Sequence, residues 1–193
     1  MAKMEKDIDD HIKALLSTKR ELTNTREYAE EMARSANKDP LTGVKNKRSY
    51  ETAVTGLNSD ISTNTAGFGI AVIDMNDLKL TNDTYGHERG DEAILMLCSI
   101  ICRVFKRSPV YRYGGDEFAV ILKGHDLEQI DSLVRRFRDD LKAQRNREGA
   151  EPWLKISAAI GYAVFDPAVD DDANRVFQRA DKAMYEDKMR SKG

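Results

Sequence analysis

The hydrophobic pattern after residue 39 switches repeatedly between helix-like and strand-like spacing. A continuous apolar run over residues 68–73 predicts a buried central strand, which we expect to stop at Asp74. Apolar side chains that recur every three or four residues predict four helices, over residues 47–57, 88–105, 127–145 and 173–189.

A hairpin is predicted over residues 110–122, where two alternating runs flank Gly114 and Gly115. Residues 154–165 alternate as one or two further strands, with Gly161 as a bend. A hairpin placed between two strand-helix units is typical of the split βαβ plan. We therefore predict an α+β fold of the ferredoxin-like type, with a mixed or antiparallel sheet flanked by helices.

The first 37 residues are rich in Lys, Glu, Asp and Ala and contain no Gly or Pro, which predicts one long helix. Lys19 and Arg26 interrupt its apolar seam, so a parallel coiled-coil dimer and a solvated single helix both remain open. Asp39-Pro40 then breaks the helix, which predicts a helical stalk over residues 1–38 and a globular domain over residues 39–193. The seam consists of Ile8, Ile12, Leu15, Leu22, Ala29, Ala33 and Ala36.

Composition narrows the classes of partner and the compartment. The formal net charge of −2 argues against nucleic acid or an anionic membrane as the main partner. No stretch approaches the roughly 18 consecutive apolar residues of a membrane helix, and residues 1–10 are too polar for a signal peptide. Cys98 and Cys102 have helical spacing, so we expect two buried thiols rather than a metal site, which suits a reducing cytoplasm.

Candidate chemistry begins at the predicted hairpin, where Asp116 and Glu117 follow the glycine pair. A turn without side chains at Gly114 and Gly115 lets a nucleotide approach the backbone closely. Most Gly-Gly-acid hairpins are plain solvated turns, but here the first strand and the hairpin are expected to be neighbours, which brings Asp74 to the same edge. Three such carboxylates suit Mg²⁺ and the phosphates of a nucleoside triphosphate.

The polar block from Asp74 to Asp91 contains groups that can recognise a base. The amide of Asn82 both donates and accepts, and the carboxylate of Asp91 can accept two hydrogen bonds from the N1 and N2 edge of guanine. Lys79 and Lys182 are candidate phosphate ligands, although a single lysine is more often a solvated surface residue.

Four blocks together resemble the GGDEF family of diguanylate cyclases, over residues 39 to about 190. The resemblance implies a palm-like fold and the condensation of two GTP molecules into cyclic di-GMP. It implies metal binding by Asp74, the Met75 carbonyl and Glu117, with Asp116 in the catalytic acid pair, and Mg²⁺ or Mn²⁺ as the cofactor. It also implies that Asn82 and Asp91 bind guanine and that Lys79 and Lys182 bind phosphate. The blocks are residues 39–48, 74–91, 114–118 and 180–185.

Departures from the family pattern are also informative. Phe105 and Ser108 stand where members under product inhibition carry an Arg-x-x-Asp motif, so feedback of that type is not expected. Leu78 replaces a frequent Phe, and Glu186 stands at an often basic position, which puts triphosphate contacts there in question. Residues 188–193 lack the usual Gly-Arg-Asn ending.

The resemblance predicts a magnesium-dependent bacterial second-messenger enzyme that works as a homodimer, with an upstream sensor domain if the chain is part of a longer protein. In that mechanism each chain binds one GTP, so the stalk is the natural place for control. The alternatives are a catalytically silent GTP-binding or interaction module and a different phosphoryl transfer on a palm-like scaffold.

Overall fold

The structure is a computed structural model that describes residues 15–26, 28 and 36–192. The chain divides into two compact units, Met1–Lys38 and Asp39–Gly193. In the first unit residues 15–26 are helical, and Leu15 and Leu22 are 69% and 66% exposed. The dimer seam stays a prediction, because four of its members lie outside the described residues, namely Ile8, Ile12, Ala29 and Ala33.

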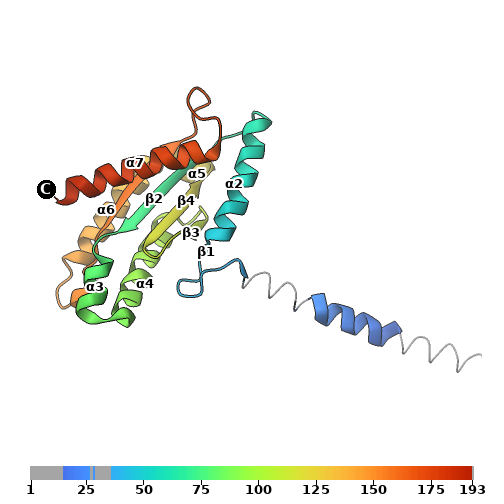
Figure 1. Cartoon of the computed structure of the whole chain (residues 1–193), viewed down its shortest axis with the longest axis horizontal. Helices are drawn as coiled ribbons and strands as arrows, with labels where there is room; N and C mark the ends of the chain where they lie inside the picture. Colours follow the sequence, from blue (N-terminus) through green and yellow to red (C-terminus); the bar gives the residue numbers. More distant parts are fainter. Residues whose placement is uncertain (1–14, 27, 29–35, 193) are drawn as a thin grey trace, which may run out of the picture. The chain divides into compact units, whose positions relative to one another are not determined.

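The second unit contains a sheet with helices on both faces (Figure 1). Its elements are β1 (Lys45–Asn46), α2 (Lys47–Ser62), β2 (Gly69–Met75), α3 (Leu78–Tyr85), α4 (His87–Val104), β3 (Val110–Arg112), β4 (Glu117–Leu122), α5 (Gly124–Glu128), α6 (Ile130–Arg145), the 3₁₀ helix η1 (Pro152–Leu154), β5 (Ala158–Val164) and α7 (Ala173–Lys192).

The sheet has the strand order β1-β3-β4-β2-β5. Only the pair β1-β3 is parallel, and β3-β4, β4-β2 and β2-β5 are antiparallel. The expected α+β fold with a mainly antiparallel central sheet is therefore confirmed. Strand β2 lies inside the sheet, where it pairs on both sides, and every one of its residues is buried.

Side chains of β2 alternate between two hydrophobic clusters, one on each face of the sheet. Ala71 and Ile73 pack into the cluster formed with α4 and α6. Ile70 and Val72 pack into the other cluster, formed with α2 and α7. This double burial explains why the segment is continuously apolar, and it fixes the strand end that carries Asp74.

Helix α7 lies directly on β5 at Gly161. A Cβ atom at this position would lie 2.0 Å from the Met184 backbone nitrogen and 2.3 Å from the Ala180 carbonyl oxygen. Strand β5 runs unbroken through Gly161, so the expected bend is wrong. The glycine instead permits the close approach of a helix, which positions the C-terminal half of α7.

Two further expectations differ from the structure. Strand β2 runs one residue past Asp74 to Met75, and the polar block contains helix α3, which the apolar pattern did not predict. Cys98 is buried but Cys102 is exposed, so only one of the two thiols faces the core.

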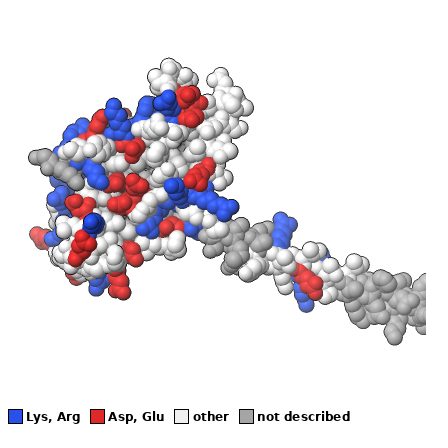
Figure 2. All heavy atoms as spheres, viewed as in Figure 1, with Lys and Arg blue, Asp and Glu red and all other residues white. Residues whose placement is uncertain are grey.

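The surface is mixed in charge, as the near-neutral sequence predicts. Acidic and basic side chains are interspersed over the face seen in Figure 2. Among the residues that the structure describes, no helix is long and apolar enough to cross a membrane.

Candidate functional site

The predicted acidic residues meet where β2 and β4 run side by side. Asp74 pairs in register with Glu117, and the Met75 backbone N–H donates to the Asp116 carbonyl at 3.1 Å. Asp74 is only 8% exposed. Burial raises the pKa of Glu117, and the nearby carboxylates of Asp74, Asp116 and Asp181 raise it further. The structure therefore gathers several carboxylates in a partly desolvated site around Glu117.

The hairpin between β3 and β4 is tight because two backbone N–H groups share one acceptor. Tyr113 and Gly114 both donate to the Glu117 carbonyl, at 2.8 and 3.2 Å. A Cβ atom on Gly114 would lie 2.4 Å from Glu117 Oε2, so the glutamate side chain folds over this glycine. Gly115 is exposed, and its position has open space around it. The two glycines thus leave room beside the carboxylate.

Arg112 joins this hairpin to the start of the domain. Its Nη2 donates to the Gly115 carbonyl at 2.7 Å, and its Nη1 donates to Asp39 Oδ1 at 3.0 Å. Thr42 also donates to Asp39, through its backbone N–H and its hydroxyl. One arginine therefore holds the hairpin tip against the first turn after the stalk.

Lys188 enters the site from α7, and sequence analysis did not assign it a role. Its Nζ lies 2.5 Å from Asp74 Oδ1. A signal was present: Ala180 and Met184 are buried at four-residue spacing, and Lys188 continues this stripe with a cation where an apolar residue is expected. Asp181, on the same helix, was likewise not predicted as a neighbour of Glu117.

The donor set fits a hard divalent cation in its chemistry. Mg²⁺ binds through one or two carboxylates together with waters and substrate phosphates, and Asp74 and Glu117 supply two carboxylates beside the Met75 carbonyl. In the described part of the chain no three His, Cys, Asp or Glu side chains form a ready metal cage. The ammonium of Lys188 meets Asp74 instead, so a cation at Asp74 would compete with this ion pair.

The predicted base-binding residues lie on α3 and α4, which Gly86 joins. A Cβ atom on Gly90 would lie 1.8 Å from Asn82 Oδ1, so the asparagine side chain rests on the Gly90 backbone, next to Asp91. Asn82 is half-buried, and Asp91 is exposed near the start of α4. The structure thus places Asn82 beside the residue that precedes Asp91.

The remaining predicted ligands are surface residues. Lys79 is exposed on α3, and Lys182 is exposed on α7 one residue after Asp181. It is Lys188 that contacts the acidic residues directly. Glu186 is also exposed.

The region of the absent Arg-x-x-Asp motif is closed by contacts within the domain. Phe105 is fully buried and packs near Phe137, with ring centroids 6.3 Å apart. The Ser108 hydroxyl and the Arg107 backbone N–H donate to the buried carboxylate of Asp126, at 2.8 and 3.2 Å. These contacts give a local structural role to the residues at the two motif positions.

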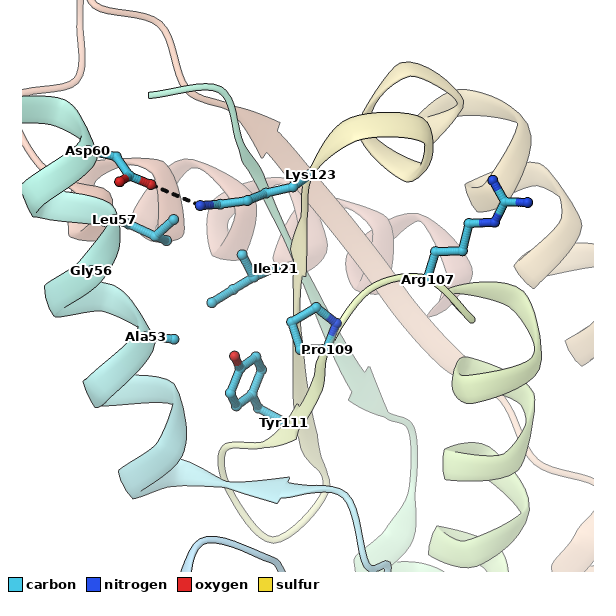
Figure 3. A pocket seen from close by; sticks show the side chains of 9 residues that line it. All are labelled: Ala53, Gly56, Leu57, Asp60, Arg107, Pro109, Tyr111, Ile121 and Lys123. Carbon is cyan, nitrogen blue, oxygen red and sulfur yellow. Dashed lines mark hydrogen bonds and ion pairs between the residues drawn. The ribbon is translucent and has the colours of Figure 1, made fainter. Parts of the chain in front are cut away.

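A separate cavity of about 390 Å³ lies between α2 and the β3-β4 hairpin (Figure 3). Leu57, Tyr111 and Ile121 line it, and the Lys123 ammonium donates a hydrogen bond to Asp60 Oδ2 at 2.8 Å. None of the predicted site residues lines this cavity. The candidate site is therefore the region around Asp74 and Glu117, and this cavity is separate from it.

Comparison with known proteins relates this arrangement to one family. Residues 36–193 match the family model "Diguanylate cyclase, GGDEF domain". A probable diguanylate cyclase, DgcC of Escherichia coli, is 30% identical over 167 residues, which cover 86% of this chain and 44% of DgcC. Diguanylate cyclase DgcP of Pseudomonas aeruginosa is 27% identical over 95% of this chain and 28% of its own length. The chain thus spans less than half of each of these relatives.

Two solved structures share the fold. The coiled coil and GGDEF domain of DgcB from Caulobacter crescentus, in complex with c-di-GMP, is 27% identical with a TM-score of 0.78, covering 91% of this chain and 92% of that one. Diguanylate cyclase SiaD of Pseudomonas aeruginosa, in complex with its activator SiaC, is 23% identical with a TM-score of 0.71, covering 97% and 71%. The SiaD match shows similarity of fold alone.

Proposed function

Because the chain belongs to the GGDEF-domain family of diguanylate cyclases, we propose that it condenses two GTP molecules into cyclic di-GMP and pyrophosphate. The observation that carries this proposal is the pairing of Asp74 with Glu117 in register, beside the glycine hairpin. Family enzymes generally use Mg²⁺, and the proposed ligands here are the Asp74 and Glu117 carboxylates and the Met75 carbonyl.

In the proposed reaction the 3′-oxygen of each GTP forms a bond to the α-phosphorus of the other. The bond from that phosphorus to the pyrophosphate oxygen breaks, the pyrophosphate leaves with the bonding electrons, and the hydroxyl proton passes to solvent water. Bound Mg²⁺ supplies charge neutralisation at the phosphates. Asp74 and Glu117 hold the phosphate end in place, and Asp116 completes the acidic group at the hairpin tip.

Substrate recognition is assigned to the surrounding elements. Asn82 and Asp91 bind the guanine edge, which the position of Asn82 on the backbone of Gly90, the residue before Asp91, supports. The backbone at Gly114 and Gly115 approaches the nucleotide, and Lys79 and Lys182 bind phosphate oxygens. We add Lys188 to the phosphate side, because its ammonium can leave Asp74 for a phosphate once a cation neutralises the carboxylate.

One chain supplies one half of this reaction, so we propose a homodimer with two facing half-sites. The stalk is the proposed control element, and its exposed leucines support an association role. We also propose a cytoplasmic enzyme, which the two free cysteines suit. A sensor domain upstream is proposed because the curated relatives are more than twice as long as the matched region.

One observation favours a catalytically silent GTP-binding module as the second candidate. Lys188 already pairs with Asp74. Among the described residues, no three His, Cys, Asp or Glu side chains lie close enough together to hold a metal ion. The two functions differ in whether binding leads to turnover.

The test uses the full chain with GTP and Mg²⁺, and mass spectrometry of the product. The enzyme proposal expects cyclic di-GMP from the wild type, and it expects Asp116→Ala to bind GTP by calorimetry without turnover. GTP binding by the wild type with no product, while an established cyclase is active in the same assay, would establish the silent module instead.

A further inference from the structure

Trp153, the chain's only tryptophan, bridges the two helices that carry the base-binding pair. It lies in η1, about sixty residues beyond α4's first turn, and is half-buried. Its ring lies against Tyr85 at the end of α3, with centroids 5.7 Å apart. It also contacts α4, because the Arg89 guanidinium lies 4.6 Å from the ring and Nε1–H donates to Glu92 Oε2 at 2.6 Å.

The three partners of Trp153 flank the proposed guanine ligands. Tyr85 follows Asn82 by three residues, so the two side chains are neighbours on α3. Arg89 and Glu92 lie on either side of Asp91 in the first turns of α4. A single side chain from a distant segment therefore contacts both helices near their functional residues.

Helix α3 has a limited hold on the hydrophobic core, because Leu78 packs against the core without being buried. None of its residues is buried. Gly86, whose φ is +88°, links it to α4, and Asn82 also rests on the Gly90 backbone of that helix. A short helix without a buried residue belongs to the less stable parts of a fold, so contacts from outside the helix pair matter for its orientation. The contact of Tyr85 with Trp153 restricts that orientation from outside the helix pair.

The α4 side of the bridge is held by mutual contacts. Arg89 forms an ion pair with Glu92, and its guanidinium stacks on the ring of Trp153. Glu92 in turn accepts a hydrogen bond from Trp153. The hydrogen bond from Trp153, together with Arg89, keeps the pKa of Glu92 below its ordinary value although burial opposes this. Charge-assisted hydrogen bonds and cation-π contacts are stronger than neutral polar contacts, so the ring has a defined position.

We propose that Trp153 is a positioning residue that aligns Asn82 and Asp91 and thereby sets the affinity and selectivity for guanine. It acts through Tyr85, Arg89 and Glu92 and need not touch the substrate. This inference rests on the proposed function, because it takes Asn82 and Asp91 as the guanine ligands. Displacing either ligand by a fraction of an ångström weakens hydrogen bonds to the base edge.

The test compares the wild-type full chain with Trp153→Ala and Trp153→Phe. The probes are the α,β-methylene analogues of GTP and ITP, which cannot release pyrophosphate. The base of the ITP analogue lacks the 2-amino group of guanine, whose hydrogen bond Asp91 is proposed to accept. Affinities are measured by calorimetry with Mg²⁺, and turnover is measured separately with GTP. Phe165→Ala is the matched control, because Phe165 is an aromatic residue stacked on Phe68 at the opposite end of β2.

For Trp153→Ala we expect the KM for GTP to rise about tenfold with kcat changed less than about twofold, because binding geometry is lost rather than a reacting group. The preference for the GTP analogue over the ITP analogue should fall in parallel. Trp153→Phe keeps a ring but loses the N–H donor, so its loss should be smaller. Phe165→Ala should lower the melting temperature without changing the preference. In the wild type, the fluorescence of Trp153 should change on addition of the GTP analogue.

An unchanged guanine preference in both Trp153 variants would overturn the inference, as would an equal loss of affinity for the two analogues. If the alanine variant does not melt cooperatively, the guanine preference of Trp153→Phe tests the inference. A wild type that binds the GTP analogue but makes no cyclic di-GMP would refute the enzyme proposal while the selectivity test still stands. Absence of any binding by the wild type would overturn both.

Discussion

Asp74 is the residue on which the site is organised, because it combines burial, a central strand position and a charged partner. It lies opposite Glu117 across the strand pair, and Lys188 holds its Oδ1 at 2.5 Å. A buried carboxylate that loses its cation is left uncompensated, which destabilises the folded protein. Lys188 therefore stabilises the metal-free state, and a cation that binds at Asp74 would take over this role.

Lys188→Ala tests this exchange through stability. We expect the free energy of unfolding without Mg²⁺ to fall by about 1–2 kcal/mol, because the pair is partly exposed and weaker than a fully buried one. Added Mg²⁺ should restore part of the loss. Lys142→Ala, an exposed lysine on α6, is the control and should change little. Urea unfolding with and without Mg²⁺ measures the effect, and an equal loss in both conditions would contradict the exchange.

Asp39 gives a prediction for pH. Burial opposes its ionisation, but hydrogen bonds from Thr42 and Arg112 outweigh it and hold the pKa below the ordinary 3.8. A lowered carboxyl pKa contributes stability at neutral pH that is lost as pH falls through the folded-state pKa. Asp39→Asn should therefore be less stable than the wild type at pH 7, and the difference should shrink below about pH 4. Urea unfolding at both pH values checks this, and a difference that does not vary with pH would be evidence against the Arg112 contact.

Among the elements, α7 lies on the sheet through its buried side chains and through a close backbone approach at Gly161 of β5. The helix carries Asp181 and Lys188 to the acidic edge, and Gly161 of β5 allows it to lie there. The hairpin is fixed differently, by its own backbone bonds and by Arg112. Displacement of α7 would therefore disturb the site while leaving the hairpin formed.

Gly161→Ala should displace α7. The added methyl would lie 2.0 Å from the Met184 nitrogen, far inside contact distance, so the helix must shift or the fold must lose stability. We expect a loss of about 3 kcal/mol or more in unfolding free energy. Gly67→Ala is the matched control, because nothing lies within 4 Å of its added Cβ. Equal stability of the two variants in urea unfolding would refute the close contact.

The extent to which sequence predicts these elements depends on the kind of signal. The apolar run of β2 and the Gly114-Gly115 hairpin predicted their strands, because double burial and turn geometry act locally. Helix α3 was not predicted, since it buries no residue and has no apolar stripe. The role of Gly161, the contact of Lys188 and the exposure of Cys102 depend on which surfaces meet after folding, and no local pattern encodes that.

At the level of the whole molecule, the proposed reaction needs two chains, and the stalk is the proposed means of pairing them. Leu15 and Leu22 belong to the predicted seam and are largely exposed. Leu16 is a neighbouring leucine of similar exposure, 61%, that lies off the seam. An exposed apolar seam on a helix is the pattern of a coiled coil, and it provides a matched comparison within one helix.

Leu22→Glu should weaken pairing, because it places like charges across a parallel seam. We expect the protein concentration needed for half-maximal specific activity to rise about tenfold, which corresponds to about 1.4 kcal/mol. Leu16→Glu should leave that concentration unchanged. Analytical ultracentrifugation of both variants gives the dimer population independently of activity. If both substitutions have the same effect, the seam is not the pairing surface.

The central claim is that Asp74 and Glu117 hold a shared cation for a reaction between two GTP-loaded chains. The most direct test is the rate of cyclic di-GMP formation per chain, measured against protein concentration with and without Mg²⁺, for the wild type and for Glu117→Gln. The account predicts a wild-type rate per chain that rises with concentration, requires Mg²⁺ and is lost in the variant. A rate per chain that does not change with dilution, or full activity in Glu117→Gln, would contradict it.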